Sequence, residues 1–143
     1  MATKLEAIAA LKDLRGFIGK AQLEALGHAM RGEEKQWFFD KLVELAATTR
    51  SMPRTYDTDG QGDQALARLH YFTSGADWHV TERDVDTDGL GQVQAFGMAD
   101  LGHGPELGYV SIVELLENGA ELDLHFKPST LASLGLSLAP AKD

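Results

Sequence analysis

Apolar side chains recur at spacings of three and four over the first 52 residues, which is the pattern of amphipathic helices. A capping box of Thr3 and Glu6 opens the first predicted helix, because each side chain can reach the other's free backbone N–H. A second, short helix is expected to stop near Gly32. A third is expected to end at Pro53, since a proline ring cannot continue a helix.

From residue 65 onward the apolar period changes to two, which is the period of a half-buried strand. Two strand-like segments, "LARLHYFT" and "WHVTERDV", flank "SGAD", a plausible four-residue hairpin loop. "QVQAFGMADL" and "ELDLHF" are further strand candidates. Between those two segments, Ser111 and Glu114 form a second capping box that opens a short helix, and Gly119 closes it.

This order of elements predicts an α+β fold. N-terminal helices would pack with a small antiparallel sheet of about four strands plus one short helix. The length of 143 residues fits a single domain. We expect residues 1–52 to form its helical part, residues 53–127 to be mainly strands, and residues 128–143 to be a tail.

The predicted hairpin separates its side chains onto two faces if Thr73 pairs with Trp78. One face, with Leu69 and Val80, has the composition of a core. The other collects cationic and aromatic side chains, so it could bind an anion, a base or a carboxylate of a partner. A plain face, solvated or covered by the N-terminal helices, is the alternative, and a register slip of one residue would break the cluster up. The members of this cationic face are Arg68, His70, Phe72, His79 and Arg83.

The amino-acid composition excludes several kinds of site and segment. The chain has no cysteine, which excludes disulfides, thiolate nucleophiles and cysteine zinc sites. Charged residues interrupt the apolar positions of the N-terminus, so no signal-peptide core is expected, and no apolar run approaches the roughly 20 residues that span a membrane. We expect a cytoplasmic protein with no membrane partner.

The net charge of -9 hides an asymmetry along the chain. Residues 1–55 hold nine Lys/Arg and seven Asp/Glu, a net charge of +2, whereas residues 56–143 hold four and fifteen, a net charge of -11. Spaced carboxylates can occupy a cationic groove as phosphates do. The predicted acidic, partner-binding surface consists of Asp57, Asp59, Asp63, Glu82, Asp84, Asp86, Asp88 and Glu106.

Two near-identical hexapeptides, "DTDGQG" at 57–62 and "DTDGLG" at 86–91, raise the question of a metal site. A calcium loop of the EF-hand type needs a bidentate glutamate at its twelfth position, where this chain has Arg68 and Gly97. Asp-Gly instead suits the positive φ of a turn, and both copies fall where connections are expected. We therefore favour two turns and predict no metal and no cofactor. A cation held by the first copy's aspartates together with Asp63 is the alternative.

Other candidate motifs give weaker indications of a metal, nucleotide or catalytic site. His70 and His79 are within ligand reach of each other in the hairpin, yet no H-x-x-x-H spacing accompanies them. "GHGPELG" lacks the spacing of a dinucleotide fingerprint and the lysine of a phosphate loop, and no G-x-S-x-G elbow is present. No catalytic residue is predicted.

Two blocks of the sequence, "LHYF…ADW…TE.D" and "AFG…DLG…PELGY.SI.EL", carry a resemblance to a known family. With "MPRTYDTDGQGD" before them and "LDLHF" after, they span about residue 52 to 127. This stretch resembles an uncharacterised domain-of-unknown-function family of small accessory proteins of plasmids, prophages and integrative elements. The resemblance implies a mobile-element context and an α+β core, and it supplies no catalytic motif.

We therefore expect a non-enzymatic accessory protein of a mobile element that binds a host or defence protein. That partner would be a basic nucleic-acid-binding protein, and the acidic surface would act as a nucleic-acid mimic. A small ligand-binding module or enzyme that uses the cationic face is one alternative. Direct nucleic-acid binding by the N-terminal helices is another, which the acidic chain as a whole disfavours. Its candidate residues are Arg15, Lys20, Arg31 and Lys35.

Overall fold

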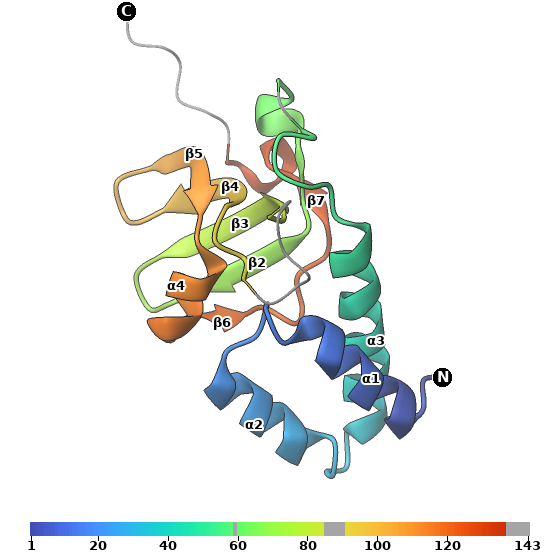
Figure 1. The fold of residues 1–143 in the computed structure, drawn as a ribbon. Helices are drawn as coiled ribbons and strands as arrows, with labels where there is room; N and C mark the ends of the chain where they lie inside the picture. Colours follow the sequence, from blue (N-terminus) through green and yellow to red (C-terminus); the bar gives the residue numbers. More distant parts are fainter. Residues whose placement is uncertain (59, 85–90, 137–143) are drawn as a thin grey trace, which may run out of the picture.

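A computed structural model of the chain describes residues 1–58, 60–84 and 91–136. Three helices come first, and an antiparallel sheet follows beside them (Figure 1). This arrangement confirms the predicted α+β class. No helix among the described residues is long and apolar enough to cross a membrane.

The helical part consists of α1 (Lys4–Leu14), α2 (Lys20–Ala29) and α3 (Lys35–Ser51). The predicted capping box opens α1, because the N–H of Glu6 donates to Thr3 Oγ1 at 3.1 Å and the N–H of Thr3 donates to Glu6 Oε1 at 2.9 Å. The third of these helices, α3, ends two residues before Pro53, as the proline predicts.

The main sheet has five antiparallel strands in the order β5-β4-β3-β2-β6. A short helix, α4, leads from β5 toward β6, and a separate two-stranded sheet pairs β1 with β7. The bounds are β1 (Leu66–Ala67), β2 (Leu69–Phe72), β3 (Asp77–Glu82), β4 (Ala95–Asp100), β5 (Pro105–Val110), α4 (Ile112–Glu117), β6 (Glu121–Leu122) and β7 (Ser129–Thr130), with 3₁₀ turns η1 (Gly62–Gln64) and η2 (Ala132–Leu134).

The two faces of the main sheet build two cores. The first face packs against the helices, and its buried Tyr71 donates a hydrogen bond from its hydroxyl to the carbonyl of Phe17 at 2.5 Å. On the second face Met98 packs with Ala67 and Leu131, which belong to the β1–β7 region. Both faces are therefore covered, but the second core is small and leaves part of its face available for a site.

The hairpin register differs from the predicted one by two residues. Tyr71 pairs with Trp78, and Phe72 pairs with Asp77. The turn explains the difference, because the N–H of Thr73 donates to the carbonyl of Ala76 at 3.0 Å and so keeps both residues in the loop. A shift of two residues leaves each side chain on its predicted face, whereas a shift of one would have exchanged the faces.

A β-bulge in β3 sets up the second face. Val80 pairs with Gly97 of β4, but Glu82 pairs with Phe96, so Thr81 is an extra residue in the ladder. Adjacent residues of β4 point to opposite faces, and the bulge therefore turns Glu82 away from the helices and onto the second face.

The contact between β3 and β4 at this bulge requires a glycine. A Cβ on Gly97 would lie 2.2 Å from the carbonyl oxygen of His79 and 2.8 Å from the Cα of Val80. We predict that Gly97→Ala lowers the free energy of unfolding by at least the roughly 1–3 kcal/mol typical of overpacking. Urea denaturation measures this change.

Gly108 provides a matched control, because it pairs directly with Gly97 and a Cβ there would meet nothing within 4 Å. Gly108→Ala should not lower the free energy of unfolding and should raise it by roughly 0.5–1 kcal/mol, because glycine weakens a strand relative to alanine. Equal losses in the two variants would show that the approach of β3 to β4 is not the constraint.

Candidate functional site

A cavity of about 430 Å³ lies on the second face of the sheet, where β4 and β5 meet Tyr56, Thr58, Gly60 and Gly62. We call it the aromatic cavity. Its described lining combines three rings with hydroxyl groups and one carboxylate. The residues that matter for its chemistry are Tyr56, Thr58, Thr81, Glu82, Phe96 and Tyr109.

In the aromatic cavity, the ring of Tyr109 is nearly perpendicular to each of the other two rings. Phe96 and Tyr109 are cross-strand partners on β4 and β5, with ring centroids 5.9 Å apart and an interplanar angle of 84°. Tyr56 meets Tyr109 at 6.3 Å and 82°, and their hydroxyl oxygens are 2.7 Å apart. The contact between these hydroxyl groups links Tyr56 to the edge strand β5.

Glu82 is the charged group of the aromatic cavity and is only 2% exposed. Its Oε1 accepts the backbone N–H of Tyr56 at 2.8 Å, and its Oε2 accepts both the N–H and the hydroxyl of Thr58. Within the described part of the chain, no lysine, arginine or histidine forms an ion pair with this carboxylate. A buried negative charge is thus held by hydrogen bonds without a counter-cation.

Tyr56 has a strained backbone, with φ of 81°. It is the one non-glycine residue with positive φ among the described positions. Such a conformation costs on the order of 1–3 kcal/mol and occurs preferentially at binding and active sites. The hydrogen bond from its N–H to Glu82 helps to hold the strained residue in place. The strain marks this segment as a candidate part of a functional site.

Asp84 forms a second buried carboxylate, with 6% exposure. Its Oδ2 accepts the N–H groups of Val93 at 3.2 Å and Gln94 at 2.8 Å, and its own N–H donates to Gln92 Oε1 at 2.8 Å. The expectation that Glu82 and Asp84 belong to an exposed acidic surface is therefore wrong. Both carboxylates satisfy backbone N–H groups inside the protein.

The other predicted acids do not form one surface. Asp57 is exposed and accepts the N–H of Arg54 at 2.7 Å, and Asp63 is half-buried in η1. Glu106 is exposed on β5, but alternation places it on the opposite side of that strand from Tyr109. Among the described members of this group, Asp57 and Asp63 belong to the segment that lines the aromatic cavity. Asp59, Asp86 and Asp88 lie outside the described residues.

Part of the predicted cationic face exists as an aromatic stack. The rings of His70 and His79 are 4.4 Å apart and nearly parallel, at 8°. Phe72 lies 5.8 Å from His70, and Phe126 lies 5.7 Å from both histidines. The structure thus brings together three of the five predicted residues and adds Phe126, which follows β6 and which sequence spacing could not have placed there.

The two arginines behave differently from the prediction. Arg68 donates from Nη1 to the carbonyl of Leu66 at 3.1 Å, and burial lowers its pKa. Arg83 leaves the cationic face because the bulge at Thr81 reverses the alternation beyond Val80. Its Nε is buried without a hydrogen-bond partner among the described residues. The prediction of a single cationic face that includes Arg83 is therefore wrong.

Both ring nitrogens of His70 are occupied. Nδ1 lies 2.9 Å from Asp123 Oδ2, and Nε2 lies 2.7 Å from Asp77 Oδ1. The pKa of His79 is lowered to about 4, chiefly by burial and also by the neighbouring His70, whereas Asp77 and Asp123 oppose the shift. This arrangement fits a packed, ordered histidine pair, and no group of three metal-ligating side chains occurs in the described part of the chain.

The cations of the N-terminal helices are dispersed over helix ends. Arg15, Lys20, Arg31 and Lys35 are all exposed. Lys20 begins α2 and Arg31 follows its end, so a helix of ten residues, about 15 Å long, separates them.

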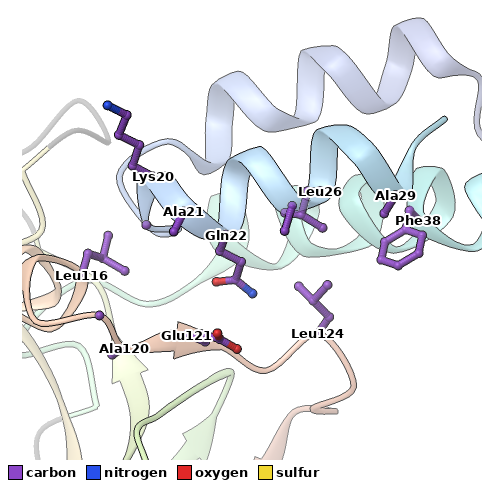
Figure 2. Close-up of a pocket in the computed structure, with 13 residues that line it drawn as sticks. Lys20, Ala21, Gln22, Leu26, Ala29, Phe38, Leu116, Ala120, Glu121 and Leu124 are labelled. Atoms are coloured by element: carbon purple, nitrogen blue, oxygen red, sulfur yellow. The ribbon is translucent and has the colours of Figure 1, made fainter. Parts of the chain in front are cut away.

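A second hollow, of about 370 Å³, lies between α2 and the β6 region (Figure 2). Figure 2 shows Gln22 extending from α2 toward the strand, with Leu26 and Leu124 beside it. Gln22 donates from Nε2 to the carbonyl of Leu122 at 2.8 Å and accepts the N–H of Leu122 at 2.9 Å. Its amide is therefore used to close the sheet edge, and the rest of this hollow is mostly apolar.

The fold and the aromatic cavity define a small α+β protein with a pocket that contains a buried carboxylate. A family model described as "Protein of unknown function (DUF2958)" matches residues 40–141, and the chain belongs to this family. The predicted resemblance to an uncharacterised family is thereby confirmed. The chain matches no curated protein and no solved structure. The matched range contains every residue of the aromatic cavity, whereas α1 and α2 precede it.

Tyr56 allows the backbone strain to be measured. Tyr56→Gly and Tyr56→Ala both remove the ring, but only glycine adopts positive φ without cost. We predict that the glycine variant has the higher free energy of unfolding, by about 1 kcal/mol.

The same pair of substitutions at Glu106, an exposed position in β5, should give the reverse order, because glycine weakens a strand relative to alanine. Urea denaturation of the four variants compares the two positions. A less stable glycine variant at both would contradict the strain at Tyr56.

The lowered pKa of His79 should make the stability of the fold depend on pH. Its folded-state pKa of about 4 lies below its ordinary value of 6.5, so the unfolded chain binds the proton first as the pH falls. The contribution of this residue is fully present above pH 6.5 and is lost progressively toward pH 4. The decrease in the urea midpoint between about pH 7.5 and about pH 5 should therefore be smaller in His79→Gln than in the wild type.

His103 supplies the control, since it is exposed in the turn between β4 and β5. His103→Gln should retain the wild-type decrease in the urea midpoint. If His79→Gln does the same, the histidine stack is not the source of the pH dependence.

Proposed function

We propose that this chain is a non-enzymatic binding protein that engages a basic partner protein through the aromatic cavity and the adjoining carboxylates of Asp57 and Asp63. The observation that carries the proposal is the buried carboxylate of Glu82, which has no counter-cation among the described residues and shares a cavity with three aromatic rings. A cationic partner supplies the charge that this site lacks.

Exposure and long-range charge support the same proposal. Tyr56 is 63% exposed and Tyr109 is 57% exposed, although both are large aromatic residues. Exposed tyrosines that flank a pocket resemble the anchors on which protein interfaces depend. The net charge of -9 attracts basic proteins and increases their rate of encounter.

The arrangement of carboxylates favours pocket recognition over mimicry of a phosphate chain. Glu82 and Asp84 are buried, and Glu106 lies on the other side of β5 from the cavity. The described acids therefore do not repeat along one exposed path. Recognition by a pocket needs only the carboxylate and the rings around it.

The histidine pair supports a binding role rather than an enzymatic one. Asp77 and Asp123 lie within hydrogen-bond distance of the two ring nitrogens of His70, so both nitrogens are engaged inside the protein and do not face the aromatic cavity. The lowered pKa of His79 reflects burial in the stack and does not place that residue in the aromatic cavity.

In this proposal the partner is a host or defence protein with a cationic surface for nucleic acid, and the chain is a cytoplasmic accessory protein of a mobile element. Two observations support this setting. The sequence blocks described above resemble plasmid, prophage and integrative-element proteins, and residues 56–143 carry a net charge of -11.

The proposal can be tested with Asp57→Asn/Asp63→Asn. Asparagine keeps an acceptor oxygen for the N–H of Arg54 while removing both carboxylate charges. A tagged wild-type chain should retain a basic protein from a bacterial lysate at low salt, and the variant should recover about tenfold less of it. Mass spectrometry of the retained proteins gives both the identity and the amount.

Glu24→Gln/Glu33→Gln is the matched control, because it changes the net charge by the same amount at two exposed positions of the helical part. It should recover the partner as the wild type does. Recovery that is equal in all three proteins, or that falls equally in both variants, would overturn the proposed surface.

A further inference from the structure

We infer that the aromatic cavity is a receptor for the cationic head group of a basic side chain, the ammonium of lysine or the guanidinium of arginine. The inference rests on the proposed function and deepens it, since it states which group of the partner enters the protein. It depends on three features of the cavity: the arrangement of its rings, the charge of Glu82 and the chemistry that its lining lacks.

The rings form walls in more than one direction. The ring of Tyr109 is nearly perpendicular to those of Phe96 and Tyr56, at 84° and 82°, and all three rings line the cavity. Aromatic π-faces are electron-rich, so several rings around one space stabilise a cation placed among them. Rings that lay parallel as a stack would leave no such space.

Glu82 adds a full negative charge to these walls. Because the carboxylate is 2% exposed, water screens it little, and its attraction for a cation in the cavity is stronger than at the surface. The hydrogen bonds from Tyr56 and Thr58 fix the position of the carboxylate before any ligand arrives. The site is therefore preorganised for positive charge.

The lining also selects against other ligands. None of the described residues that line the cavity is a lysine, an arginine or a histidine, so nothing there compensates an anion. A neutral apolar group would supply no counter-charge to Glu82, whose oxygens accept hydrogen bonds from Tyr56 and Thr58. A cation is the one class of ligand that satisfies both the carboxylate and the rings.

Size and access fit a side chain of a protein. The volume of about 430 Å³ lies within the range of about 300–1,000 Å³ typical of ligand pockets, which is ample for an ammonium or guanidinium group with its alkyl stem. Tyr56 and Tyr109 are both more than half exposed, so a side chain projecting from another protein can reach them.

An NMR titration of the full chain tests the inference without any partner protein. The probes are Nα-acetyl-lysine methylamide, Nα-acetyl-arginine methylamide, choline, and 3,3-dimethylbutan-1-ol, which has the shape of choline without its charge. The cationic probes should shift the signals of Tyr56, Phe96 and Tyr109. The neutral alcohol should bind at least about tenfold more weakly than choline.

Two substitutions probe the two sources of attraction. Tyr109→Leu removes an exposed ring, and Glu82→Gln removes the charge; each should weaken the binding of the lysine probe by about tenfold. Since Glu82→Gln can disturb the segment that Glu82 holds, Tyr109→Leu remains decisive if the charge variant loses its native spectrum. Leu101→Ala, at an exposed position in the turn after β4, should bind the probe as the wild type does.

Three results would overturn the inference. The first is equal binding of choline and the neutral alcohol, and the second is an absence of shifts at the three rings up to about 0.1 M of each cation. The third is binding of choline without either amino-acid probe, which would assign the cavity to a free quaternary ammonium compound.

The outcomes for the two proposals are separable. If the cationic probes occupy the cavity but no basic protein is retained by the Asp57 and Asp63 surface, the receptor stands and the proposed function fails. If a basic protein is retained but the probes leave the rings unaffected, the proposed function stands and the receptor fails.

Discussion

The extra residue in strand β3 decides what the second face of the sheet can do. Without the bulge at Thr81, Glu82 would follow the alternation of Val80 and point into the helical core, where a carboxylate would have few donors. With the bulge, the carboxylate reaches the backbone of the segment 54–58 and fixes it. That segment then carries Tyr56 to its contact with Tyr109. One insertion in a ladder thus positions the charge of Glu82 and, through it, the strained residue Tyr56 with its ring.

The two faces of the sheet differ in role: the first stabilises the fold, and the second contains the candidate binding site. The first face has a large core built with four helices, whereas the second has a small core around Met98 and a cavity beside it. The large core can supply most of the stability, because apolar burial is the dominant favourable term in folding. The second face is then able to keep a buried charge and a strained backbone, which a protein with a single small core would tolerate less well.

Much of the fold could be predicted from the sequence, because it depends on local rules. The capping box at Thr3, the stop before Pro53 and the faces of the hairpin follow from side-chain chemistry and a period of two. The site could be predicted only in part. His70, Phe72 and His79 gather because alternation puts them on one face, but a bulge has no clear signature in one sequence, so Arg83 and Glu82 were assigned to the wrong surroundings. The role of Tyr56 depends on long-range contacts that spacing does not reveal.

Gln22 has a consequence for how the chain avoids associating with itself. The outer edge of β6 would otherwise present the N–H and carbonyl of Leu122 to solvent, and an open strand edge is a template on which a second sheet can grow. A single side-chain amide imitates the next strand and occupies both groups. Helix α2, which carries Gln22, therefore blocks the addition of another strand at the β6 edge. At this edge the glutamine takes the place of a sixth strand.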